Sequence, residues 1–248
     1  MTIRMVGVLV YSCVSMVFAQ NHSEDLYNQW HDALAKYAYL GEADWFHSEG
    51  APAEYAQAVR AIDNAGFAMA DFICAKVAAE STDESRLYQD MFLLMHVTGI
   101  DLLRGDQFER SYKESQKRNV EDFKRNWRAG VYADVSPYIR KLCEQLTDKN
   151  EDDNLNPLEL RPIRRYGLYG IPELVRQIKI NGSNHAFAAY LIMTGNSSEY
   201  REYMNRPKLI FRSREEKLAH MEKWLGTKKG QIANNCMGGK IANALRAQ

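Results

Sequence analysis

One stretch near the middle of the chain, from Ile171 to Gly195, holds two different helix signatures separated by a turn. In its first half, apolar residues recur every three or four positions, which predicts a helix with one buried stripe and an opposite polar face. The stripe consists of Ile171, Leu174, Val175 and Ile178, and the polar face of Glu173, Arg176, Gln177 and Lys179.

The second half of this stretch predicts a helix of another kind. Pro172 suits the first turn of the first helix, Asn181-Gly182 supplies the left-handed residue that ends it, and Ser183 is a typical cap for the next. The chain is then apolar without interruption from Ala186 to Met193, so this helix has no solvated face and is expected to be buried. A buried strand is the rival interpretation, but the alanines of this run are poor strand residues. We therefore expect an antiparallel helix pair.

Helical periodicity continues along most of the chain, and no segment has the alternation typical of strands. Ser81 to Glu84 and Ser213 to Glu216 resemble helix starts, and the second has the spacing of a capping box. Gly66 and Gly238-Gly239 are expected to mark a close contact and a bend inside longer helices. Further helices are expected at residues 23–41, 51–77, 84–102, 108–127, 136–146, 157–168, 214–225 and 231–245.

The first twenty residues have the composition of an export signal. Arg4 is their only charge, an apolar segment runs from Met5 to Phe18, and Val17-Phe18-Ala19 fits the pattern read by a signal peptidase. The sequence thus predicts a signal peptide at residues 1–19, cleaved after Ala19, and a secreted or periplasmic mature protein. An uncleaved anchor would need about 20 apolar residues, and no second segment is long enough to span a membrane.

Charge is segregated along a chain whose net charge is near zero. Residues 20–106 contain fifteen acidic and five basic residues, whereas residues 161–248 contain six acidic and sixteen basic ones. This asymmetry predicts an N-terminal acidic helical region at 20–147, a polar linker or loop at 148–156, and a C-terminal basic region at 157–248. The two ends either pair with each other inside the molecule or present a basic surface to an acidic partner.

The second possibility gives the predicted binding site. Arginine predominates over lysine in this part of the chain, which favours bidentate contacts with carboxylates, so we expect an acidic protein partner. Nucleic acid is disfavoured, because a secretory signal removes the protein from most nucleic acids. The predicted partner-binding residues are Arg161, Arg164, Arg165, Arg206, Lys208, Arg212 and Arg214.

Residues 156–203 resemble a unit of the HEAT or armadillo class of helical repeats. In that class a helix with a proline and a leucine-valine stripe is followed by a short turn and an alanine- and leucine-rich helix, and no second copy at a fixed period accompanies the match here. The resemblance implies protein binding through a helical surface. The expected fold is therefore all-α, either an irregular helical bundle or a short HEAT-like α-solenoid of about eight to ten helices. The resemblance rests on Pro172, Leu174, Val175, Ile178, Asn181, Ala189 and Leu191.

Local motifs of known catalytic or metal chemistry are absent from the sequence, which indicates no cofactor and no metal site. The alternative is a secreted metal-dependent or hydrolytic enzyme whose site joins separate helices. Cys74, Cys143 and Cys236 are either three buried thiols, which act as small hydrophobic residues, or one disulfide and one thiol. The residues of the enzyme alternative are Asp44, His47 or Glu49 together with His96 and Asp101.

Overall fold

The computed structural model describes residues 21–37, 46, 50–79, 83–103, 112–147, 160–195 and 213–247. These residues form helices, 3-10 turns and connecting loops, with no strand among them, so the predicted all-α irregular bundle is confirmed. The chain divides into two compact units, Met1–Phe72 and Ile73–Gln248, which are described separately. The predicted signal peptide at 1–19 and the linker at 148–156 lie outside the described residues.

The first unit is built around aromatic side chains. A helix at residues 21–36 buries Trp30 completely, and the ring of Trp30 stacks on that of Phe46 with their centroids 5.5 Å apart. Helix α2, Ala53–Ala65, buries Tyr55 and Ile62 on its inner side. The large rings of Trp30 and Tyr55 thus form part of the core of this unit together with aliphatic side chains.

The single helix expected over residues 51–77 is broken in the structure. Helix α2 ends at Gly66, whose positive φ of 49° is incompatible with a continuing α-helix. A 3-10 turn, η2, Gly66–Met69, follows and leads into α3, Ala70–Ala78. The apolar periodicity is correct for both helices, but Gly66 ends a helix where a close contact was expected.

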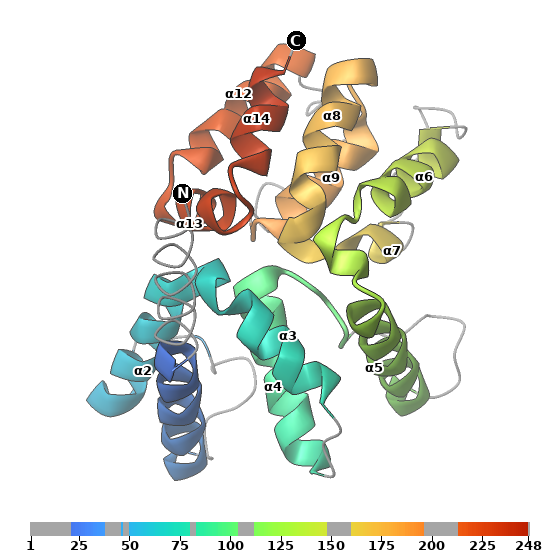
Figure 1. Ribbon diagram of the computed structural model, residues 1–248. Helices are drawn as coiled ribbons and strands as arrows, with labels where there is room; N and C mark the ends of the chain where they lie inside the picture. Colours follow the sequence, from blue (N-terminus) through green and yellow to red (C-terminus); the bar gives the residue numbers. More distant parts are fainter. Residues whose placement is uncertain are drawn as a thin grey trace, which may run out of the picture. The chain divides into compact units, whose positions relative to one another are not determined.

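The predicted helix pair lies at the centre of the second unit, and Figure 1 shows its two members side by side. Helix α8, Ile171–Asn181, ends at Gly182 in the left-handed conformation, and α9, Asn184–Met193, begins after Ser183. The Ser183 hydroxyl accepts a hydrogen bond from the backbone N–H of Ala186 at 3.1 Å. Every residue from 186 to 191 is at most 1% exposed, as expected for a helix without a solvated face.

Helices that precede and follow this pair in the chain pack on it. Helix α6, Ser136–Thr147, packs on α8 and α9, while α12, Arg214–Leu225, and α14, Lys240–Arg246, pack on α8 (Figure 1). Buried Lys217 of α12 donates to the Gly182 carbonyl at the C-terminal end of α8, where the helix dipole favours a cation.

Two details of the C-terminal helices also follow from local sequence. The capping box is present, since the backbone N–H of Glu216 donates to the Ser213 hydroxyl at 3.2 Å and the Glu216 carboxylate accepts from the Ser213 N–H at 2.7 Å. The bent helix expected at 231–245 is instead two helices, α13, Lys228–Cys236, and α14. Gly238 and Gly239 both have positive φ and break it.

The remaining helices of the second unit precede α8 in the chain. They are α4, Glu84–Thr98; α5, Tyr112–Arg128; and the short α7, Arg161–Arg164, with 3-10 turns η3, Val131–Ala133, and η4, Gly167–Gly170. Turn η4 lies against the end of α4, and a Cβ at Gly167 would come within 2.3 Å of the Thr98 carbonyl oxygen. Gly167 is therefore required there for space as well as for its positive φ of 51°.

Candidate ligand-binding cavity

The three arginines of the segment around α7 have different surroundings. Arg164 is largely buried, with a side-chain exposure of 12%, and its Nη2 lies 2.7 Å from Oδ2 of Asp101, which is 3% exposed. The backbone N–H of Asp101 also donates to the Arg164 carbonyl at 3.4 Å. Arg164 therefore ties α7 to the segment after α4, and this placement does not support its predicted role in binding a partner.

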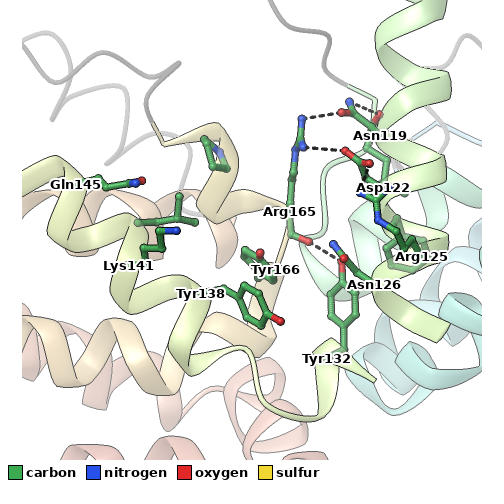
Figure 2. A pocket seen from close by; sticks show the side chains of 14 residues that line it. Asn119, Asp122, Arg125, Asn126, Tyr132, Tyr138, Lys141, Gln145, Arg165 and Tyr166 are labelled. Atoms are coloured by element: carbon green, nitrogen blue, oxygen red, sulfur yellow. Dashed lines mark hydrogen bonds and ion pairs between the residues drawn. The ribbon is translucent and has the colours of Figure 1, made fainter. Parts of the chain in front are cut away.

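Arg165 points to the other side of α7, toward α5. Its Nη2 donates to Oδ1 of Asn119 at 2.8 Å, and its Nη1 lies 3.6 Å from Oδ2 of Asp122 (Figure 2). The Arg165 carbonyl accepts a hydrogen bond from the Tyr132 hydroxyl at 2.9 Å. The side chain remains 44% exposed, so Arg165 is both fixed in position and accessible.

Arg165 forms part of a cavity of about 320 Å³ between α5 and α6. In Figure 2, Asn119, Asp122, Arg125 and Asn126 of α5 form one side, Tyr138, Lys141 and Gln145 of α6 form the other, and Arg165 and Tyr166 lie between them. The lining is completed by Leu102, Phe123, Tyr132, Leu142 and Pro162.

Stacked tyrosines line one part of this cavity. The rings of Tyr138 and Tyr166 are 5.9 Å apart with an interplanar angle of 26°, and Tyr132 lies 6.2 Å from Tyr166. Burial raises the pKa of Tyr132 and, together with the nearby Tyr138, that of Tyr166. Tyr132 is buried and Tyr166 is half-buried, whereas Tyr138 is 45% exposed and offers a ring to a ligand.

The cavity lining has an excess of positive charge. It contains the cations of Arg125, Lys141 and Arg165 and the carboxylate of Asp122. Oδ1 of Asp122 accepts a hydrogen bond from Nη2 of Arg125 at 2.7 Å, which neutralises one of these cations. Lys141 has no ion pair with any residue in the part of the chain that the structure describes. An anionic ligand is thus favoured over a cationic one.

Of the other predicted partner-binding residues that the structure describes, neither Arg161 nor Arg214 lines this cavity. Arg214 donates to the Lys179 carbonyl at 3.3 Å, near the C-terminal end of α8, whereas α7 leads through η4 into the N-terminal end of the same helix. Eleven residues of α-helix span about 16 Å, so the structure does not bring Arg214 and the arginines of α7 together. Arg161 lies in the first turn of α7, and Arg206, Lys208 and Arg212 lie outside the described residues.

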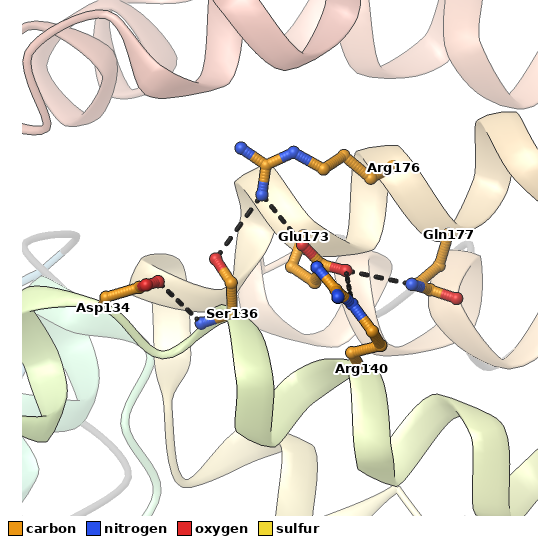
Figure 3. Close-up of polar contacts among 6 residues, drawn as sticks. All are labelled: Asp134, Ser136, Arg140, Glu173, Arg176 and Gln177. Atoms are coloured by element: carbon orange, nitrogen blue, oxygen red, sulfur yellow. Dashed lines mark hydrogen bonds and ion pairs between the residues drawn. The ribbon is translucent and has the colours of Figure 1, made fainter.

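A second polar cluster connects α6 to α8 and corrects the polar face predicted for α8. Glu173 is only 1% exposed, and its carboxylate accepts hydrogen bonds from Arg140 Nε at 3.2 Å, Arg176 Nη1 at 2.8 Å and Gln177 Nε2 at 2.9 Å (Figure 3). Gln177 is buried as well. The packing of α6 on this face covers it, and the two arginines compensate the buried charge.

The start of α6 is fixed next to this cluster. Oδ1 of Asp134 accepts a hydrogen bond from the Ser136 backbone N–H at 3.1 Å, and this bond is the main reason that the pKa of Asp134 is lowered (Figure 3). Arg176 Nη1 also lies 3.4 Å from the Ser136 hydroxyl. The cluster is thus a network that positions α6 against α8, and α6 in turn carries one wall of the cavity.

The residues proposed for an enzyme site do not assemble in the described part of the chain. Asp44, His47 and Glu49 lie outside the described residues, and Asp101 is paired with Arg164. Among the described residues, no group of three or more histidine, cysteine, aspartate or glutamate side chains is placed to hold a metal ion. The enzyme alternative stays a hypothesis.

The three cysteines form no disulfide with one another in the structure. Cys74, Cys143 and Cys236 are all free, with the first two buried and Cys236 exposed. Of the two sequence interpretations, the structure has the reduced form, although only two of the thiols are buried.

No helix within the described ranges combines the length and the apolar character needed to cross a bilayer.

Comparisons with protein-family models, with curated proteins and with solved structures yield no match for this chain. The resemblance of residues 156–203 to a helical repeat is therefore not supported by a related family or fold.

Sequence reasoning missed most of the cavity-lining residues. Asn119 and Asp122 lie on α5, for which the sequence predicts a helix with only a narrow apolar stripe. Tyr138 and Lys141 are ordinary surface residues of α6 by their periodicity. The one available signal was the unusually polar character of α5, which requires a neighbour to hold it. That signal does not identify the neighbour.

Proposed function

We propose that this protein is an exported helical binding protein that captures an acidic segment of another protein in the cavity between α5 and α6. The observation that carries the proposal is the combination of Arg125, Lys141 and Arg165 with a single carboxylate and stacked tyrosines in one cavity. Tyrosine and arginine are the residue types that most often dominate binding energy at protein interfaces.

The contacts of Arg165 and of the tyrosines favour a role in ligand binding over a role in solubility alone. A guanidinium forms two parallel hydrogen bonds with a carboxylate, and it does so at a low entropic cost when its orientation is already fixed. Arg165 is oriented by Asn119, and the packing of Tyr166 against both Tyr132 and Tyr138 orients the rings. A site held in this way loses little freedom when a ligand enters.

The proposed location outside the cytoplasm rests on residues 1–19. A short apolar segment with one positive charge and small residues before the cleavage point is typical of secreted proteins. N-terminal sequencing of the exported protein should give a chain beginning near Gln20. A mature chain that retains Met1 would contradict export by this route.

Charge reversal of Lys141 tests the binding proposal. Tagged mature protein is incubated with the native extracellular or periplasmic fraction, and the captured proteins are compared for the wild type and Lys141→Glu at low and high salt. We expect the variant to lose the captured partner, and the wild-type capture to weaken as salt rises, since exposed charges are screened.

The matched control is Lys223→Glu, which makes the same charge change at an exposed position of α12 outside the cavity. This control should retain the partner, and both variants should unfold at the wild-type denaturant concentration. Equal capture by Lys141→Glu and wild type would rule out the cavity as the binding site.

A further inference from the structure

We infer that the group bound in the cavity is a carboxylate carried next to an aromatic ring, and that Asp122 competes with this carboxylate for Arg165. The inference rests on the proposed function and specifies the chemistry of the bound group. It makes Asp122 a residue that sets the specificity of the site.

The contacts of Asp122 show that it holds Arg165 only loosely. Its Oδ1 is committed to Arg125 at 2.7 Å, whereas its Oδ2 lies 3.6 Å from Nη1 of Arg165. The second distance exceeds that of a charge-assisted hydrogen bond, which is about 2.7–2.9 Å. Asn119 meanwhile fixes the other terminal nitrogen of Arg165. A ligand carboxylate can therefore form a shorter bond to Nη1 than Asp122 does.

Lys141 on the opposite wall supplies a second positive charge for the same ligand. It lines the cavity from α6, while Arg165 lines it from the segment after α7 (Figure 2). With Asp122 engaged by Arg125, the charges that face an incoming group are those of Lys141 and Arg165. A carboxylate between the two walls would neutralise part of this excess.

The tyrosines give the reason for an adjacent ring. Tyr166 is held between Tyr132 and Tyr138, and Tyr138 is half-exposed, so a further ring can continue the stack from the cavity side. The volume of about 320 Å³ is at the lower end of the range of about 300–1,000 Å³ for ligand sites. It fits one aromatic residue with its carboxylate better than a long segment.

Two sources provide this chemistry in a protein partner: a C-terminal aromatic residue, or an acidic side chain next to an aromatic one. N-acetyl-tyrosine represents the first, and the N-acetylated, C-terminally amidated dipeptide Asp-Tyr represents the second. N-acetyl-tyrosinamide has the same ring as the first probe but no carboxylate. Binding of each probe to the mature chain is measured by NMR titration.

We expect N-acetyl-tyrosine, the dipeptide or both to bind about tenfold more tightly than N-acetyl-tyrosinamide, because a charge-assisted contact is worth about one factor of ten. Whichever acid binds more tightly identifies the source. Asp122→Asn should strengthen binding of that acid about three- to tenfold, since it removes a competing negative charge, and should leave the amide unchanged. Lys141→Gln should weaken binding of the acid about threefold.

Glu144→Gln is the matched control, because it removes one negative charge from the exposed part of α6 outside the cavity lining. It should leave the affinity of every probe unchanged. The inference is overturned if both acids bind no more tightly than the amide, or if Asp122→Asn weakens acid binding while the amide still binds as it does to the wild type.

The two proposals fail in different ways. Loss of partner capture in Lys141→Glu without any preference for the acid probes would overturn the aromatic-carboxylate inference alone. A strong acid preference without any effect of Lys141→Glu on partner capture would overturn the protein-binding proposal and support a site for a small aromatic acid.

Discussion

The second unit contains two regions that are held together in different ways. Helix α9 is buried among apolar neighbours, with Phe187 and Tyr190 completely covered. Helix α5 buries Val120 and Phe123, but it also buries the polar side chain of Asn119. The first region is fixed by packing and the second in large part by hydrogen bonds.

The polar contacts of α5 are directed at one segment of backbone. Asn119 Nδ2 donates to the Leu102 carbonyl at 3.2 Å, and Gln116 Nε2 donates to the Leu103 carbonyl at 3.2 Å. A hydrogen bond adds about 0.5–1.5 kcal/mol net, whereas burying a large apolar side chain adds about 1.5–3 kcal/mol. Apolar burial in the α8–α9 pair therefore contributes more to the stability of the unit than the hydrogen bonds of α5 do. Those hydrogen bonds fix the position of α5 and leave the cavity beside it open.

The largest expected effect lies in the apolar region. Phe187→Ala should lower the free energy of unfolding by about 3–5 kcal/mol, because it leaves a cavity in place of a fully buried ring. Urea denaturation followed by circular dichroism measures this. Ile180→Ala is the control, since Ile180 is 73% exposed on α8 and its truncation should cost less than about 0.5 kcal/mol. Similar losses in both variants would show that α9 is not central.

Breaking the buried ion pair between Arg164 and Asp101 should have the next largest effect. Asp101→Asn removes the carboxylate opposite Arg164 and leaves a largely buried guanidinium with its charge uncompensated, at a cost of about 3 kcal/mol. The same denaturation measurement applies. Glu144→Gln, an exposed carboxylate on α6, should change stability by less than about 0.5 kcal/mol. A negligible loss of stability in Asp101→Asn would show that this ion pair is accessible to solvent.

Alkaline pH should reduce the contribution that Cys143 of α6 makes to the free energy of unfolding. Burial, with the charges of Glu173 and Glu144, raises the pKa of the Cys143 thiol from 9.0 to about 12. The folded state therefore keeps its proton when the unfolded state loses it, so this contribution is complete below pH 9 and is lost as the pH rises to 12. Wild type should lose about 1 kcal/mol more than Cys143→Ala between pH 9 and 10. Parallel pH profiles would contradict this shift.

The smallest effect is expected in the cavity wall. Asn119→Ala should cost only about 0.5–1 kcal/mol, because water in the adjoining cavity can take over the hydrogen bonds to Leu102 and Arg165. Binding should suffer more than stability, since Arg165 loses its fixed orientation. N-acetyl-tyrosine titration and urea denaturation of the same variant separate the two. A loss of stability as large as that of Phe187→Ala would erase the distinction between the two regions.

Local signals predicted the central pair because they concern neighbours in sequence. These signals are the i, i+3 and i+4 spacing, the left-handed Gly182 and the Ser183 cap. Each acts within a few residues, so together they specify two helices separated by a turn in any helical fold. Gly66 shows the limit of such signals, since a glycine inside a periodic run is compatible with either a close contact or a helix break.

The cavity was not predictable in the same way. Asn119, Tyr138 and Arg165 come from separate elements, and only the tertiary structure brings them to one cavity. Arg164 and Arg165 are adjacent in sequence and equally basic, yet one is buried against Asp101 and the other faces the cavity. Arg165 keeps helical backbone angles at the end of α7, and successive side chains of a helix point about 100° apart, so the two arginines face different neighbours.

The sequence by itself determined the all-α class, the buried α8–α9 pair and the capped helix starts, because these depend on short-range periodicity and turn chemistry. Only the tertiary structure decided which charged residues are buried and which are accessible. The carboxylate of Glu173 lies in the interior because α6 brings Arg140 to it and Arg176 lies one turn away. A buried charge is tolerated only beside its partner, and distant segments supply such partners through the packing of the whole unit.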